Sequence, residues 1–127
     1  MDIVFHPIGY IHSQYTDISK TPKNGEDSPV EALIELDSKY LEAISDMEVG
    51  KKYIVLFYFH KSKGFKQKAR LHGDGPLTGL FSTHSPNRPN PIGISTITVI
   101  DIDDNIIKFR GVDMLDGTPV LDIKQVS

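Results

Sequence analysis

A proline-rich segment in the second half of the chain places the strongest constraint on its fold. Residues 81–95 read FSTHSPNRPNPIGIS, with prolines at Pro86, Pro89 and Pro91. Proline lacks a backbone N–H and fixes φ near about −65°, so this segment can form neither a helix nor an interior strand. Because β-type sequence flanks it on both sides, we expect a long rigid loop between strands. Irregular connections of this length are usually functional or disordered.

Short apolar segments separated by turn residues make up much of the remaining chain. Residues 53–60, YIVLFYFH, are β-branched or aromatic on both faces, which is typical of a buried strand. A short helix is expected at residues 38–47, where apolar side chains follow helical spacing. Further strands are expected at residues 3–13, 30–36, 94–102, 106–112 and 120–126, of which the third and fourth form a hairpin.

This pattern predicts a mainly β fold, a small antiparallel barrel or sandwich with one short helix and long loops. Such closure covers the edges of the strands. The β–α alternation of a doubly wound fold and the glycine-rich turn of dinucleotide-binding domains do not occur. At 127 residues the chain is expected to be one domain, residues 1–127.

Composition narrows the function classes. The chain has no cysteine, and its five histidines lack the close pairings of metal sites, so we expect no metal. No apolar run approaches the about 20 residues that a membrane span needs, and the N-terminus does not resemble a secretory signal. A soluble protein of the reducing cytoplasm, without a membrane partner, is expected.

Charge is distributed unevenly along the chain. The net charge of −3 argues against a protein that coats nucleic acid by bulk electrostatics. Residues 60–70, HKSKGFKQKAR, nevertheless contain five basic side chains and no acidic one. This segment is either a local phosphate contact or a solvated lysine-rich loop.

Two segments carry candidate site residues. The proline-rich loop presents Arg88 and asparagines such as Asn90 from a rigid backbone, as substrate orientation requires, although it could also simply join two strands. Residues 112–123, VDMLDGTPVLDI, form either a simple turn or a polar backbone cradle for a small ligand, with Asp116 as a contact. His60, at the end of the apolar strand, is a candidate for the mouth of the site.

Four segments together resemble the TsaA-like (TrmO) family: IGYIHS at residues 8–13, LFYFHK at 56–61, the proline-rich segment, and DMLDGTPVLDIK at 113–124. The resemblance covers nearly the whole chain and follows the family's order and spacing. It implies a small antiparallel β-barrel that binds S-adenosylmethionine without a metal and works as a homodimer, with cofactor sites near the subunit interface. It further implies methylation of tRNA at N6 of the threonylcarbamoyladenosine that follows the anticodon.

The resemblance also assigns roles to individual residues. The implied cofactor contacts are Pro22, Lys23, Asn24, His60, Lys61, His84, Ile94, Met114, Leu115, Asp116 and Gly117. Family members usually carry arginine at the position of His84 and glutamine at that of Asn24. Many bacterial members also continue into a C-terminal domain beyond the matched region.

Roles for the remaining candidates follow from the implied reaction. Arg88 and Asn90 are expected to grip the threonyl carboxylate or a phosphate of the acceptor, because the guanidinium fork matches such anions. Asp113 and Asp116 are the carboxylates available as a base for the acceptor N–H, and Asp113 could equally be a structural residue. Contacts to phosphates of the anticodon loop are expected from Lys63, Lys66, Lys68 and Arg70. Two alternatives stay open: a non-catalytic S-adenosylmethionine-binding or regulatory module, and a methyltransferase for a different small acceptor.

Overall fold

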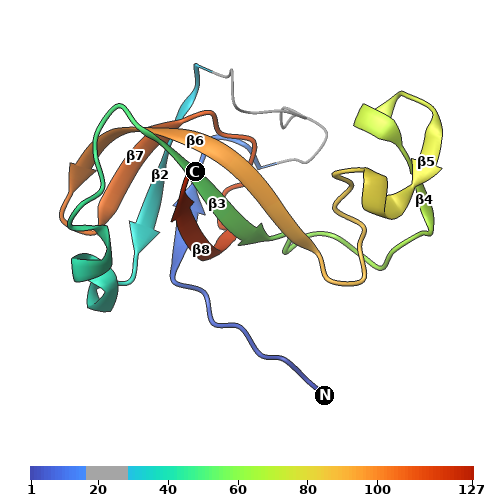
Figure 1. Ribbon diagram of the computed structural model, residues 1–127, viewed down its shortest axis with the longest axis horizontal. Helices are drawn as coiled ribbons and strands as arrows, with labels where there is room; N and C mark the ends of the chain where they lie inside the picture. The colour runs from blue at the N-terminus through green and yellow to red at the C-terminus, as the bar shows by residue number, and fades with distance from the viewer. Residues whose placement is uncertain (17–28) are drawn as a thin grey trace.

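Six antiparallel strands close into a barrel in the order β1-β2-β7-β6-β3-β8 (Figure 1). A computed structural model describes residues 1–16 and 29–127 of the chain. The barrel strands are β1 (Gly9–His12), β2 (Glu31–Leu36), β3 (Lys52–Tyr58), β6 (Ile92–Asp103), β7 (Ile106–Arg110) and β8 (Pro119–Gln125). The predicted mainly β fold is confirmed, and the closure is a barrel rather than a sandwich.

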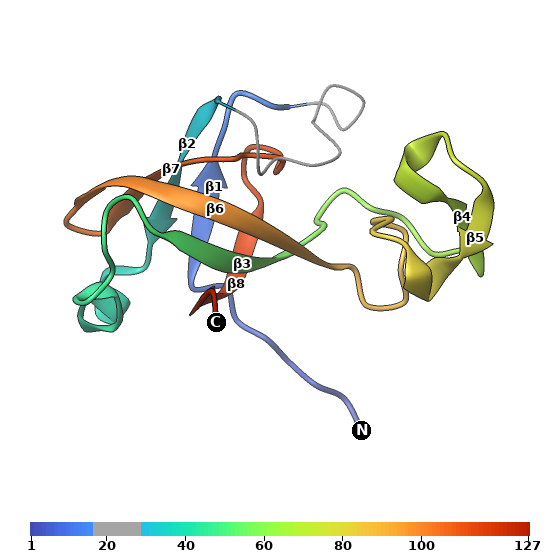
Figure 2. The same ribbon diagram turned by 45° about the horizontal axis from the view of Figure 1, so that its top comes forward.

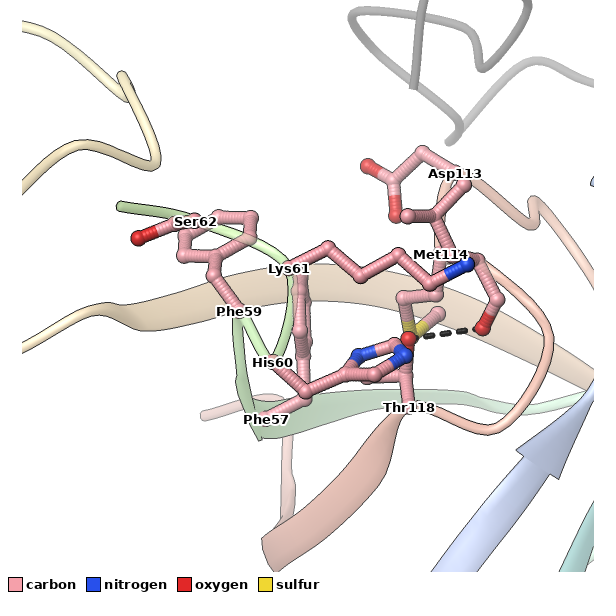
Figure 3. Close-up of a pocket in the computed structure, with 9 residues that line it drawn as sticks. Phe57, Phe59, His60, Lys61, Ser62, Asp113, Met114 and Thr118 are labelled. Atoms are coloured by element: carbon pink, nitrogen blue, oxygen red, sulfur yellow. Dashed lines mark hydrogen bonds between the residues drawn. The ribbon is translucent and has the colours of Figure 1, made fainter. Parts of the chain in front are cut away.

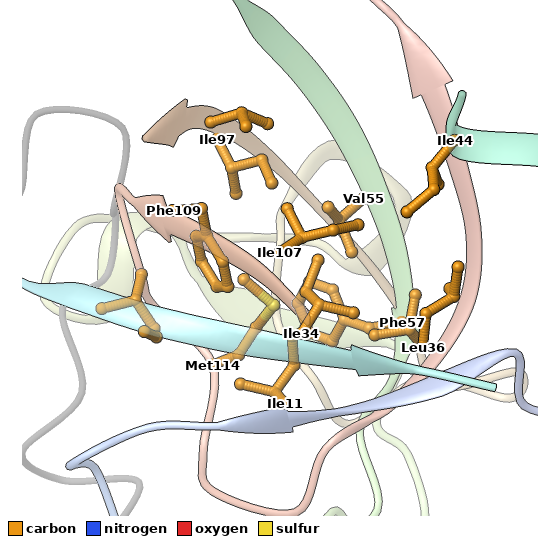
Figure 4. Packing of buried hydrophobic residues seen from close by; sticks show 14 residues of the cluster. Ile11, Ile34, Leu36, Ile44, Val55, Phe57, Ile97, Ile107, Phe109 and Met114 are labelled. Carbon is orange, nitrogen blue, oxygen red and sulfur yellow. The ribbon is translucent and has the colours of Figure 1, made fainter. Parts of the chain in front are cut away.

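The core of the barrel comes from strand residues that alternate between the two faces of the sheet. Along β2, for example, Ala32, Ile34 and Leu36 are buried while Glu31 and Glu35 are exposed. Figure 4 shows the buried side chains converging from opposite strands onto the barrel interior. The period of two along each strand is therefore what fixes which residues enter the core.

The predicted helix is present, but it is a shorter 3₁₀ helix, η2 (Ser38–Ile44), rather than one that extends to residue 47. Asp37 caps it by accepting a hydrogen bond from the backbone N–H of Lys39, 3.1 Å away. Leu41 and Ile44 lie three residues apart, the repeat of a 3₁₀ helix, and Ile44 packs into the core. Because Ile44 is the one buried residue of this segment, a short 3₁₀ helix is enough to connect β2 and β3.

The first strand is much shorter than the predicted residues 3–13. Only Gly9–His12 pair with β2, and residues 1–7 extend away from the barrel as an exposed arm (Figure 1). Apolar residues at the start of the chain resemble strand sequence, yet no strand in residues 1–16 or 29–127 pairs with them. Pro7, which has no N–H to donate, stands next to the point where pairing begins.

A projecting segment between β3 and β6, residues 62–90, is called the lobe. It contains a two-stranded sheet of β4 (Lys68–Arg70) and β5 (Leu77–Gly79), with the single turns η3 (Leu71–Gly73) and η4 (Leu80–Ser82). Figures 1 and 2 show from two directions that the lobe stands away from the barrel. The sequence pattern did not predict β4 and β5, because three-residue strands are too short to show an alternating pattern.

Candidate functional site

A pocket opens where β3 leaves the barrel and faces the segment that precedes β8 (Figure 3). The first wall comes from the end of β3 and the residues after it, and the second from residues 113–118. The pocket is lined by Phe57, Phe59, His60, Lys61, Ser62, Asp113, Met114, Leu115 and Thr118.

Two aromatic rings form the wall on the β3 side. Phe57 and Phe59 meet edge to face, with ring centroids 5.1 Å apart and an interplanar angle of 75°. Their position depends on Gly93, which pairs with Phe57 across β3 and β6. A Cβ atom at residue 93 would lie 2.4 Å from Cζ of Phe57 and 2.8 Å from Cζ of Phe59. The rings therefore occupy the space that a side chain at position 93 would need.

A tight turn forms the opposite wall. The buried Thr118, 2% exposed, donates from Oγ1 to the carbonyl of Leu115 at 2.6 Å. Gly117 has φ +82°, a left-handed conformation that favours glycine, and its N–H donates to the carbonyl of Ile11 on β1. The Asp-Gly-Thr sequence thus builds a turn whose backbone is fixed from within and from the barrel.

Ser13, at the end of β1, ties this turn to the barrel. Its Oγ donates to the carbonyl of Met114 at 2.8 Å and accepts from the N–H of Tyr15 at 2.9 Å. The N–H of Ser13 donates to Oδ1 of Asp116 at 3.1 Å. Sequence reasoning missed Ser13, although it lies in one of the four matched segments, because a serine at a strand end gives no signal of a partner about a hundred residues later.

Asp113 is held from inside the barrel. Ser95, an inward-facing residue of β6 that is 7% exposed, donates from Oγ to Oδ1 of Asp113 at 2.5 Å. Ser95 was not among the predicted site residues, because in the sequence it is one polar position in an alternating strand. The bond fixes the direction of a carboxylate on the pocket wall.

The pKa of His60 is lowered from its ordinary value of 6.5. The first cause is burial, which penalises the charged imidazolium, and the positive charge of Lys61 adds to it; the Asp116 carboxylate opposes both. His60 is therefore a neutral hydrogen-bonding group at physiological pH.

This lowered pKa predicts a pH dependence of stability. Between the lowered pKa and 6.5 the unfolded chain binds more protons at this residue than the folded one, so stability rises with pH across that window. We expect His60→Gln to reduce this slope in urea unfolding measured from about pH 5 to 8. The exposed His6→Gln is the control and should keep the wild-type slope; an unchanged slope in His60→Gln would contradict the assignment.

Several predicted cofactor contacts meet in the pocket. His60 and Lys61 line one wall, and Met114 and Leu115 line the other. Gly117 lies just beyond, since a Cβ atom built on it would be 3.9 Å from Nε2 of His60.

Other predicted residues lie elsewhere. His84 is exposed in the lobe, and Ile94 is on the outer face of β6, 49% exposed. The predicted phosphate contacts are all exposed in the lobe, namely Lys63, Lys66, Lys68 and Arg70. Pro22, Lys23 and Asn24 fall outside the described residues. Within the described ranges, no three His, Cys, Asp or Glu side chains group as metal ligands, and no helix is long and apolar enough to cross a membrane.

Arg88 is bound within its own loop. One guanidinium nitrogen, Nη1, donates to the carbonyls of Thr83 at 2.9 Å and Ser85 at 3.2 Å. The guanidinium also lies over the ring of Phe81, 5.7 Å from its centroid. Asn90 follows in the same loop and is exposed. Neither residue is among those that line the pocket, and the two bonds of Arg88 to the loop carbonyls engage a single nitrogen.

Comparisons with known proteins agree on one family. Residues 10–127 match the family model described as the tRNA-methyltransferase O N-terminal domain. A probable S-adenosyl-L-methionine-binding protein of Pyrococcus abyssi is 36% identical over 96% of this chain and 67% of its own length. The mouse tRNA (adenine(37)-N6)-methyltransferase is 33% identical over 97% of this chain, but this match covers only 30% of the mouse protein.

Solved structures give the same answer. A crystal structure of TrmO superimposes with a TM-score of 0.85 at 31% identity and covers 100% of this chain. The match spans 58% of the length of that solved chain. A TrmO structure from Pseudomonas aeruginosa has a TM-score of 0.80 at 30% identity.

Proposed function

Because the chain belongs to the family of tRNA-methyltransferase O N-terminal domains, we propose that it is an S-adenosylmethionine-dependent methyltransferase acting on tRNA. The proposed acceptor is N6 of the threonylcarbamoyladenosine next to the anticodon. The mouse relative bears the name of a methyltransferase for adenine 37, which supports this position. Residues 1–127 are proposed to act as one TsaA-like domain, in the cytoplasm, where tRNA is modified.

The observation that carries this proposal is the convergence of two distant segments on one pocket. The segment after β3 supplies His60 and Lys61, and the segment before β8 supplies Met114 and Leu115. All four are among the cofactor contacts that the family resemblance implied.

The pocket residues fit the chemistry of this cofactor. S-adenosylmethionine, when bound, supplies an electrophilic methyl group on a positively charged sulfur. The faces of Phe57 and Phe59 suit a sulfonium or an adenine ring, and the ammonium of Lys61 suits the cofactor's carboxylate. Asp113, fixed by Ser95, supplies a carboxylate for the cofactor's ammonium or for a proton.

Methyl transfer places limited demands on the chain. With the methyl donor bound, the pocket would have to hold the acceptor nitrogen in line with the methyl group and its sulfur, and a base would have to take the nitrogen's proton. The protein must therefore align the two reactants, exclude water and accept one proton. Asp113 is the proposed base, because its carboxylate lies on the pocket wall in a fixed direction.

A non-catalytic cofactor-binding module is the second candidate, favoured by the names of relatives such as the Pyrococcus protein. Transfer of labelled methyl groups to tRNA from cells that lack the endogenous enzyme separates the two. The methyltransferase predicts incorporation, with the product nucleoside identified by mass spectrometry. If calorimetry shows cofactor binding but no methyl group is incorporated into tRNA or a smaller acceptor, the non-catalytic module is favoured. If calorimetry shows no cofactor binding, both candidate functions are excluded.

We also propose a homodimer through the outer face of β3 and β6. Cross-strand pairs Tyr58–Ile92 and Leu56–Ile94 gather apolar side chains there, and three of the four are exposed. An apolar face of this kind is self-complementary across a two-fold axis. Such a dimer would let Ile94 of one protomer approach the pocket of the other, which accounts for its place among the implied cofactor contacts.

Ile94→Lys tests the dimer. A lysine at the centre of an apolar interface should weaken self-association by roughly a hundredfold, since the charge would be desolvated without a partner. Analytical ultracentrifugation over a concentration series measures this, and calorimetry shows whether cofactor affinity falls with it. Val49→Lys, an equally apolar and exposed position outside this face, is the control. A wild-type protein that sediments as a monomer would contradict the proposal.

A further inference from the structure

The lobe differs in charge from the rest of the molecule. It carries five basic residues and one acidic residue, whereas the complete chain has 14 Lys and Arg against 17 Asp and Glu. The acidic residue is Asp74, and the basic ones are Lys63, Lys66, Lys68, Arg70 and Arg88. A positive surface on an otherwise acidic protein directs a polyanion to this one place.

The lobe also exposes two aromatic rings among these cations. Phe81 is 82% exposed and Phe65 is 51% exposed, although neither ring is needed to fill the barrel core. The N–H of Leu80 donates to the carbonyl of Gln67 at 2.9 Å. This bond brings Phe81 beside the segment that contains Phe65 and Lys66, so rings and cations lie on neighbouring chain segments.

The Phe81 ring is supported from one side. The guanidinium of Arg88 lies 5.7 Å from its centroid, and the exposure of the ring leaves the remaining surface accessible. Arg88 is in turn bonded to the carbonyl of the buried Thr83, whose Oγ1 donates to the carbonyl of Leu80 at 2.7 Å. The ring and its supporting cation are thus attached to a well-bonded loop, which lowers the entropy lost when a ligand stacks on it.

We infer that Phe81, backed by Arg88 and flanked by Phe65, is a stacking platform for unpaired RNA bases. The inference rests on the proposed function, and it assigns base contacts to a surface for which only phosphate contacts had been expected. Unpaired bases stack on exposed aromatic rings while nearby cations neutralise the phosphates between them. The concentration of cations around the rings favours RNA over an apolar protein partner, which would gain little from them.

The test measures binding of a fluorescent anticodon stem-loop RNA, and of a duplex of equal length, by the full chain. We expect Phe81→Leu to weaken stem-loop binding by about tenfold, since leucine keeps the apolar surface but removes the stacking face. Phe81→Trp should restore binding. Duplex binding should stay unchanged, because its bases are already stacked on one another.

Two further variants sharpen the result. Leu77→Ala removes another exposed apolar side chain of the lobe and should bind as wild type. The slope of the logarithm of the binding constant against the logarithm of the salt concentration counts the released counterions. Lys66→Ala should reduce this slope by about one, whereas Phe81→Leu should leave it unchanged. This difference separates a lost base contact from a lost phosphate contact.

Wild-type stem-loop affinity in Phe81→Leu would overturn the platform. So would a loss of self-association in ultracentrifugation, which would make Phe81 part of the subunit interface. A methyl-transfer assay shows whether the stacking platform or the proposed methyltransferase function is wrong. If RNA binding depends on Phe81 but no methyl group is incorporated, the stacking platform is supported and the proposed methyltransferase function is wrong. If methyl groups are incorporated but RNA binding does not depend on Phe81, the methyltransferase function is supported and the platform is wrong.

Discussion

Gly93→Ala is expected to destabilise the protein by about 3 kcal/mol and to weaken binding of S-adenosylmethionine at least tenfold. The added methyl group would lie 2.4 and 2.5 Å from two atoms of the Phe57 ring, far inside van der Waals contact. Phe57 is buried in the barrel core, so its ring cannot swing into solvent. Relief requires both rings to move, and Phe57 and Phe59 form one wall of the pocket.

Urea unfolding and calorimetry with S-adenosylmethionine measure the two effects in the same preparation. Gly79→Ala is the matched control, because no atom lies within 4 Å of the position that its new methyl group would take, and its φ of −53° suits any residue. That variant should be as stable as wild type, or slightly more so. Equal behaviour of the two alanine variants would show that the aromatic wall is not held as described.

A double-mutant cycle locates the cause. Phe57→Leu alone leaves a cavity in the core and costs stability. Combined with Gly93→Ala, the smaller side chain makes room for the new methyl group, so the double variant should be more stable than the sum of the single effects predicts. Simple additivity would mean that the glycine is required for another reason.

The barrel was predictable because burial repeats along its strands. In β2, β6 and β7 buried residues alternate with more exposed ones, and the turn at residues 103–105 separates β6 from β7, so the hairpin was predictable from the pattern. The same logic failed for residues 3–7 because pairing needs a neighbouring strand, which sequence alternation cannot supply. It failed for β4 and β5 because three residues cannot display a period.

The candidate site was predictable where short motifs carry their own chemistry. One such motif is the turn at Asp116, Gly117 and Thr118, because these residue types are typical of turns. Ser13, Ser95 and Gly93 were not recognised as site residues, because each acts through a contact with a residue distant in sequence. A single chain gives no signal for such pairs. Ile94 lies on the outer face of β6, and the proposed contact with a second protomer would leave no pattern within one chain.

The role of Arg88 leads to the second large expected effect. Its Nη1 is engaged with the carbonyls of Thr83 and Ser85, which is a structural task within the loop. The planar guanidinium has further N–H groups, at Nη2 and Nε, that can donate to an anion in parallel. We propose that Arg88 does both, bracing the loop with one nitrogen and binding the threonyl carboxylate of the acceptor with the others.

Two ligands that differ only in charge separate these tasks. The free threonylcarbamoyladenosine nucleoside carries the carboxylate, and its methyl ester does not. Wild type should bind the acid more tightly than the ester, and Arg88→Ala should lose at least tenfold in affinity for the acid and little for the ester. With tRNA, turnover should fall more than tenfold while affinity for S-adenosylmethionine stays near wild type.

A purely structural Arg88 gives a different pattern. If the side chain only braces the loop, Arg88→Ala weakens the acid and the ester equally, and the wild type does not distinguish them. Arg88→Lys provides the matching control, because lysine keeps the positive charge and one donor for a loop carbonyl but loses the planar fork. Partial recovery of loop stability in Arg88→Lys, without recovery of the preference for the acid, would assign recognition of the acceptor to the fork itself.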